Sequence, residues 1–110
     1  MARNNSLEMG ELTDTYYYIL VSLIKPKHGY LIMKSVEEMS QGKFSIGPAS
    51  LYTSIKKLLN AELIKLTKES SKKKVYIITN KGIESLKNEI EKKREMIQIA
   101  ENIFNNKEML

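Results

Sequence analysis

The segment that decides the fold is Gly47-Pro48-Ala49-Ser50-Leu51-Tyr52-Thr53-Ser54-Ile55-Lys56-Lys57-Leu58-Leu59-Asn60. Pro48 suits the first turn of a helix, because this position needs no N–H donor and the fixed φ of proline is already helical. Leu51, Ile55 and Leu58 are spaced four and three residues apart, so they form one apolar stripe that must pack on a core. The other side of the helix and its flanks carry side chains that can hydrogen-bond phosphates and base edges: Ser50, Tyr52, Thr53, Lys56, Lys57 and Asn60.

An ordinary solvated helix face is the alternative, and the distribution of charge argues against it. The chain has a formal net charge of +5. Residues 48–76 carry seven lysines and two glutamates, whereas acidic and basic residues balance in 1–47 and again in 77–110. The whole excess of positive charge therefore lies on this helix and the segment after it, as in proteins that bind polyanions. Lysines that only keep the protein soluble remain the alternative.

Composition narrows the class of protein. The 110 residues, 42% of them hydrophobic and 28% charged, allow one globular domain with a modest core. There is no cysteine and His28 is the single histidine, so metal sites and histidine-based triads lack their parts. The five glycines are scattered and form no phosphate-binding loop. We expect no enzyme, no metal and no cofactor.

The chain also shows no signal for membrane insertion or secretion. Its longest apolar run, Ile19-Leu20-Val21-Ser22-Leu23-Ile24, is too short to span a bilayer. Residues 1–5 lack the apolar core of a secretory signal. We therefore expect a cytoplasmic protein with no membrane partner.

Two helices are expected before the deciding segment. Residues 1–11 are polar and are predicted to form a flexible tail. Thr13 or Asp14 can cap a helix to about Lys25, where Pro26 follows. A second helix should open at His28-Gly29-Tyr30 and run to about Ser40, with Gly42 as a left-handed cap. Its expected buried face consists of Ile32, Met33, Val36 and Met39, and Phe44-Ser45-Ile46 could pair with a sheet edge.

A β-hairpin should follow the deciding segment. Leu63–Lys68 and Val75–Thr79 are rich in β-branched and aromatic residues. Between them lies the polar tip Glu69-Ser70-Ser71-Lys72-Lys73. The sequence therefore predicts a hairpin with a basic tip.

From Asn80 onward the pattern is again helical, with apolar positions spaced alternately three and four residues apart. A helix this long cannot bury such a seam on so small a domain, so a second copy of the helix is the simplest partner, giving a homodimer. A helix folded back on its own domain is the alternative. Lys93 would be costly in a buried seam unless it reaches solvent or pairs with Glu89. The predicted seam consists of Ile83, Leu86, Ile90, Lys93, Ile97, Ala100 and Phe104.

Three helices followed by a basic hairpin is the order of a winged helix-turn-helix, in which the second motif helix enters the major groove and the hairpin reaches the flanking backbone. The predicted fold is therefore mostly α with a small β-hairpin. Residues 12–79 should form the winged-helix domain, and residues 80–110 one long C-terminal helix.

Several short motifs within residues 12–86 resemble those of the PadR family of bacterial transcriptional regulators. The most specific are His28-Gly29-Tyr30 and Pro48-Ala49-Ser50-Leu51-Tyr52, joined by Lys72-Lys73-Lys74-Val75-Tyr76 and Thr79-Asn80-Lys81-Gly82. The resemblance implies a dimeric repressor of the small subfamily, with one C-terminal dimerisation helix. It also implies a near-palindromic operator in double-stranded DNA, and relief by a small apolar or phenolic effector.

The resemblance assigns roles to residues that the pattern had already singled out. Ser50, Tyr52, Thr53, Lys56 and Lys57 would lie on the recognition helix. The lysines would neutralise phosphates, Ser50 and Tyr52 would fix the register, and Thr53 and Asn60 would reach base edges. A core position beside Leu51 is the alternative for Tyr52. Backbone contacts would come from Tyr18 and Tyr30, and wing contacts from Lys72, Lys73 and Lys74.

The chain departs from the family at Glu62, where many members have a glycine, and in having neither tryptophan nor a wing-tip arginine. Phosphate binding by the wing is therefore favoured over minor-groove recognition. The main competing function is a winged-helix assembly module without a specific DNA site, in which the C-terminal seam is the working surface.

Overall fold

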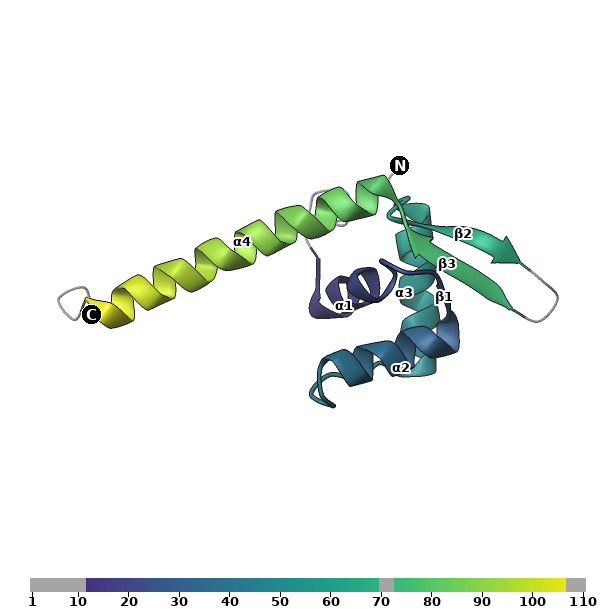
Figure 1. Cartoon of the computed structure of the whole chain (residues 1–110), viewed down its shortest axis with the longest axis horizontal. Coiled ribbons are helices and arrows are strands. Elements are labelled where there is room, and N and C mark those ends of the chain that lie inside the picture. Colours follow the sequence, from purple (N-terminus) through teal and green to yellow (C-terminus); the bar gives the residue numbers. More distant parts are fainter. Residues whose placement is uncertain (1–11, 70–72, 107–110) are drawn as a thin grey trace.

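The computed structural model describes residues 12–69 and 73–106 and contains the four predicted helices and the two strands of the predicted hairpin in the expected order, with one additional short strand (Figure 1). The molecule measures 62 × 36 × 22 Å because the last helix projects from the domain. The prediction of a mostly helical winged helix-turn-helix with a small hairpin and one long C-terminal helix is confirmed. The elements are α1 (Asp14–Ser22), β1 (Lys27–His28), α2 (Gly29–Met39), α3 (Pro48–Asn60), β2 (Ile64–Glu69), β3 (Lys74–Ile78) and α4 (Asn80–Asn105).

The first helix, α1, is capped as expected but ends earlier than expected. The hydroxyl of Thr13 accepts a hydrogen bond from the N–H of Tyr16 at 3.4 Å. The helix ends at Ser22 rather than near Lys25. Tertiary contacts decide this end, because the Ser22 carbonyl accepts from Lys27 Nζ at 2.7 Å. The next carbonyl, that of Leu23, accepts from the backbone N–H of Ile78 in β3 at 2.9 Å.

The turn after α2 contains the predicted left-handed glycine. Gly42 has φ 79° and its N–H donates to the Glu37 carbonyl at 2.8 Å. Met39 was expected on the buried face but is 40% exposed. Phe44 packs against the core instead, and the Ser40 hydroxyl holds the returning chain by accepting from the Phe44 N–H at 3.0 Å.

The sheet contains a strand that the sequence analysis missed. Its strand order is β1-β3-β2, and both pairs are antiparallel. Lys27 and His28 pair with Tyr76 and Val75. The prediction that residues 44–46 could pair with the hairpin edge was wrong, because the short connection between α1 and α2 runs along β3 and occupies that edge.

The core lies between the three domain helices and the sheet. The predicted stripe of α3 is buried, with Leu51 and Leu58 fully enclosed and Ile55 3% exposed. The fully buried side chains come from every layer: Ile19, Leu20, Leu23, Ile32, Val36, Leu51, Leu58, Leu63 and Ile64.

The start of α4 is fixed to the domain by several contacts. The Thr79 hydroxyl accepts from the Gly82 N–H at 3.0 Å and donates to the Glu62 carbonyl at 2.7 Å. A Cβ on Gly82 would collide with the carbonyl oxygen of Leu63, so the helix is in close contact with the turn between α3 and β2. Beyond the first three turns α4 leaves the domain (Figure 1). None of the helices in the described ranges combines the length and apolar character needed to cross a bilayer.

Candidate nucleic-acid interface

One side of α3 is open to solvent and carries all six of the polar residues singled out from the sequence. Leu51, Ser54, Ile55 and Leu58 are buried and anchor the helix. Because these four define one side, the polar residues are presented on the other side and on the two flanks. The exposed residues are Ser50, Tyr52, Thr53, Lys56, Lys57 and Asn60.

A hydroxyl-lined hollow of ≈ 380 Å³ lies between the N-terminal parts of α1 and α3. Hydroxyls both donate and accept hydrogen bonds, so they suit phosphate and sugar oxygens. The sequence analysis used Thr13 only as a helix cap and did not include Thr15 or Tyr16 among the contact residues. The run of hydroxyl residues around the cap is the sequence feature that could have pointed to them. The hollow is lined by Thr13, Thr15, Tyr16, Ala49, Ser50, Thr53 and Ser54.

The opposite flank of α3 meets the start of α2. Tyr52 is 52% exposed, so the alternative of a core tyrosine is excluded. Its hydroxyl end lies over Gly29, the first residue of α2. Tyr30 is 60% exposed and lines a second hollow of ≈ 360 Å³ with residues that include Pro48.

The remaining predicted contact residues differ in where they lie relative to the N-terminal half of α3. Tyr18 is half-buried and stacks on Phe44 with ring centroids 4.8 Å apart, so the structure does not bring its ring to the open side of α3. Asn60 is the last residue of α3, more than three turns from Pro48. Lys73 and Lys74 are exposed at the start of β3, and Lys72 lies outside the described residues.

Two further lysines make hydrogen bonds within the domain. Lys27 Nζ donates to the Ser22 carbonyl at the end of α1, as described above, and Lys81 Nζ donates to the Ala61 carbonyl at the end of α3 at 2.9 Å. Both place a positive charge at the negative end of a helix. These two lysines therefore stabilise the domain, whereas Lys56 and Lys57 extend from it.

The predicted seam on α4 divides into two parts. Leu86 is buried in the core of its own domain and Ile90 is half-buried against that core. Leu86 is therefore taken up by packing within the chain, because the first turns of α4 lie on the domain. Farther along, Ile97 is 56% and Phe104 73% exposed. Ile83 is 36% exposed and Ala100 is also exposed.

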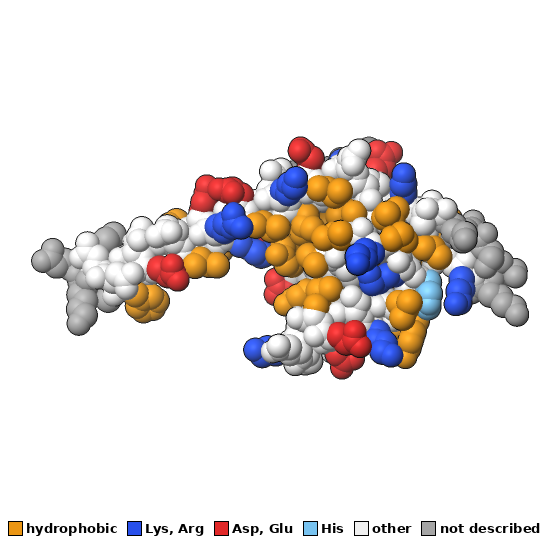
Figure 2. All heavy atoms as spheres, in the orientation of Figure 1, with side chains coloured by type: hydrophobic (Ala, Val, Ile, Leu, Met, Phe, Trp, Pro, Cys, Tyr) orange, Lys and Arg blue, Asp and Glu red, His pale blue; other side chains and the backbone are white. Residues whose placement is uncertain are grey.

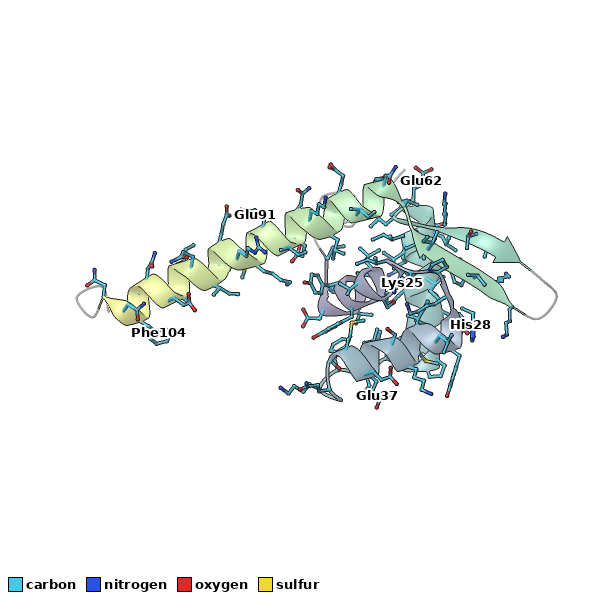
Figure 3. The ribbon with its side chains drawn as sticks, viewed as in Figure 1. Lys25, His28, Glu37, Glu62, Glu91 and Phe104 are labelled. Carbon is cyan, nitrogen blue, oxygen red and sulfur yellow. The ribbon has the colours of Figure 1, made fainter. Side chains whose placement is uncertain are left out.

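The exposed apolar face of the projecting part is wider than the predicted seam. Met96 and Ile99 are 58% and 61% exposed, and neither was included in the seam. At about 100° per residue both lie on the side of Ala100 away from Ile97, so the apolar strip is wider than the narrow seam of a two-stranded coiled coil. Figure 2 shows apolar side chains gathered beneath the N-terminal part of α4, where it leaves the domain, and again near its C-terminal end, where Figure 3 labels Phe104.

Lys93 pairs with Glu89, the partner that the sequence analysis suggested for a lysine in the seam. Its Nζ lies 3.2 Å from Glu89 Oε2 and 5.2 Å from the centroid of the Tyr17 ring. Glu89 is only 4% exposed, and its Oε1 has no hydrogen-bond partner. The ion pair and the ring therefore compensate the lysine where α4 crosses α1.

The described residues bring together no three His, Asp or Glu side chains able to hold a metal ion. The side chains of the α3 face can make hydrogen bonds and attract negative charge. Short hydroxyls, a phenol and two ammonium groups face solvent on one rigid helix, with a strand pair carrying further lysines beside it.

Comparison with known proteins agrees with this architecture. Residues 19–88 match the family described as "Transcriptional regulator PadR-like family". The chain is 30% identical over 74 residues to the transcriptional regulator YqjI of Escherichia coli, a match that covers 67% of this chain and 34% of that protein. The chain thus spans about a third of the length of the curated relatives it matches.

Solved structures give the same fold. A PadR family transcriptional regulator from Eggerthella lenta superposes with a TM-score of 0.72 at 18% identity, over 92% of this chain and 88% of that one. A transcriptional regulator from Clostridium thermocellum gives 0.69 at 24% identity, over 89% and 97%.

Proposed function

Because this chain belongs to the PadR-like family of transcriptional regulators, we propose that it binds a near-palindromic operator in double-stranded DNA as a homodimer and represses transcription until a small molecule releases it. The family is one of regulators rather than enzymes, in agreement with the expectation from the sequence. The observation that carries the proposal is the open side of α3, where Thr53, Lys56 and Lys57 face solvent within the region that holds the whole excess of positive charge.

In this proposal α3 lies in the major groove. Thr53 and Asn60 reach base edges, since a hydroxyl and an amide can each donate and accept. Lys56 and Lys57 neutralise phosphates. The hydroxyl-lined hollow beside α1 receives a sugar–phosphate segment, and Ser50 and Tyr52 fix the register from the two flanks. Lys72, Lys73 and Lys74 bring the hairpin to the flanking backbone.

The division of labour follows the fold. In this proposal residues 12–79 form the DNA-binding unit and residues 80–110 the dimerisation helix, while the predicted tail of residues 1–11 lies outside the described residues. The exposed residues of the projecting part, among them Ile97 and Phe104, support a second copy as partner because so wide an apolar strip is unfavourable in water. Two-fold symmetry then pairs two recognition helices about 34 Å apart, or a multiple of that.

An apolar or phenolic effector is compatible with the aromatic cluster beside α4. Tyr17 and Tyr18 pack edge to face at 5.9 Å, and Tyr18 stacks on Phe44. Tyr17 also contacts Lys93 of α4, so a ligand that enters this cluster would shift the helix that joins the two copies. Such a regulator would act in the cytoplasm of a bacterium, where its operator lies.

The test is a titration of mixed-sequence duplex by fluorescence anisotropy at several salt concentrations, followed by selection of bound duplexes from a random pool. A DNA binder loses affinity with a log–log slope of about −0.9 per neutralised phosphate. Lys56→Ala should flatten the slope by about one unit. Lys87→Ala makes the same charge change at an exposed position of α4 and should leave the slope unchanged. A flat response of the unmodified protein would refute DNA binding and favour the assembly module, whose working surface would be α4.

A further inference from the structure

Two motifs that are distant in the sequence are in contact in the structure: His28-Gly29-Tyr30 and Pro48–Tyr52. An ideal Cβ built on Gly29 would lie 2.5 Å from Tyr52 Oη, 3.0 Å from Cζ and 3.1 Å from Cε1. All three of the nearest atoms belong to the same side chain. Because Gly29 has no side chain, the end of the Tyr52 ring can occupy the space where a Cβ would lie.

The backbone gives no other reason for a glycine at this position. Gly29 is the first residue of α2, and its backbone is helical and outside the left-handed region. In the interior of a helix alanine is the better helix former by about 1 kcal/mol, and at the first helical position it should be at least as well tolerated as glycine. The helix itself therefore does not require a glycine here.

Tyr52 is only partly enclosed. It lies on a flank of α3 and is 52% exposed, so the core does not bury its ring. Its neighbours in the sequence divide between the two sides of the helix, with Leu51 buried and Thr53 exposed. The close approach to Gly29 brings the hydroxyl end of the ring between α2 and α3.

We propose that Gly29 is a positioning residue for DNA recognition: it seats the Tyr52 phenol between the two helices of the motif, so that the hydroxyl meets a phosphate oxygen at a fixed register. The inference rests on the proposed function. It adds that a residue without a side chain controls the position of one that contacts the DNA. An added methyl at Gly29 must displace the phenol or increase the separation of α2 and α3.

The test is a double-mutant cycle on the full chain with Gly29→Ala, Tyr52→Ala and the double variant. Thermal unfolding and DNA affinity are measured at a temperature where every variant is folded. Gly29→Ala alone should weaken DNA binding by about threefold or more, because the added methyl displaces the end of the Tyr52 ring. In the Tyr52→Ala background the same change should leave the affinity unchanged, because there is no ring to displace. The change in Tm caused by Gly29→Ala should also be more favourable in the Tyr52→Ala background than in the wild type.

Two further variants sharpen the cycle. Tyr52→Phe removes the atom at 2.5 Å and leaves the carbon at 3.0 Å, so Gly29→Ala should cost less in this background than in the wild type. Gly47→Ala is the matched control, because a Cβ at Gly47 meets no atom within 4 Å and should show no coupling to Tyr52.

The outcomes separate the two proposals. Equal effects of Gly29→Ala in both backgrounds, in a protein that binds DNA, would refute the positioning role and leave the proposed function intact. A wild-type protein that binds no duplex at low salt would refute the proposed function and the positioning role together.

Discussion

Replacement of Glu62 by glycine should stabilise the protein, although it removes a whole side chain. Glu62 joins α3 to β2 with φ 63°, in the left-handed region that favours glycine. A residue with a Cβ costs roughly 1–2 kcal/mol in this conformation. Glycine recovers that strain but loses about 0.5–1 kcal/mol through the greater freedom of the unfolded chain. The net gain expected for Glu62→Gly is therefore about 0.5–1 kcal/mol.

The contacts of Glu62 survive the change because they belong to its backbone. Its N–H donates to the Leu59 carbonyl at 3.0 Å, and its carbonyl accepts from the Thr79 hydroxyl at 2.7 Å. The side chain is exposed. Glycine keeps both hydrogen bonds, so the strain at φ is the main quantity that changes.

Thermal unfolding followed by circular dichroism measures the effect, and the gain corresponds to a rise in Tm of about 2–5 °C for a chain of this size. Glu62→Ala is the control, since it removes the carboxylate and keeps the strain, and its Tm should remain within about 2 °C of the wild type. Equal rises for the two variants would assign the gain to the lost carboxylate. A lower Tm for Glu62→Gly would refute the argument from backbone strain.

Three other substitutions test separate features. Gly82→Ala should destabilise by about 3 kcal/mol or more in urea unfolding, because its Cβ would collide with the Leu63 carbonyl; an unchanged midpoint would contradict the close contact. Ile97→Glu should give a monomer in sedimentation while the domain keeps its Tm, since Ile97 is 56% exposed on the projecting part; a persistent dimer would place the interface elsewhere. Lys93→Met should lower the free energy of unfolding by about 1–2 kcal/mol, because it leaves the buried Glu89 carboxylate unpaired and because the cost is reduced by the 37% exposure of Lys93. Adding Glu89→Gln to the same chain should recover part of that loss.

Local chemistry made much of the fold predictable. Pro48 and the stripe Leu51, Ile55 and Leu58 gave α3 its correct bounds, and the change from helical to alternating apolar spacing located the hairpin. Gly42 was recognised as a left-handed cap because that conformation favours glycine. In each case the determining interactions lie within a few residues of one another.

The features that were missed depend on contacts between distant segments. The strand Lys27–His28 exists because β3 lies beside it, and a two-residue strand has no pattern of its own. The early end of α1 depends on the contact between Leu23 and Ile78. The face of α3 could be predicted, because helical periodicity fixes which side is exposed. The run of hydroxyl residues around Thr13 is visible in the sequence, but the hollow itself depends on the relative placement of α1 and α3.

The close contact at Gly82 makes α4 a lever whose pivot lies at the turn between α3 and β2. From Gly82 to Phe104 the helix rises about 33 Å, so a tilt of 5° at the pivot moves the far end by about 3 Å. The same geometry works in reverse: a displacement of about one atomic diameter at the tip turns the whole domain by a few degrees. A contact made at the far end of α4 therefore also changes the orientation of the domain that carries α3.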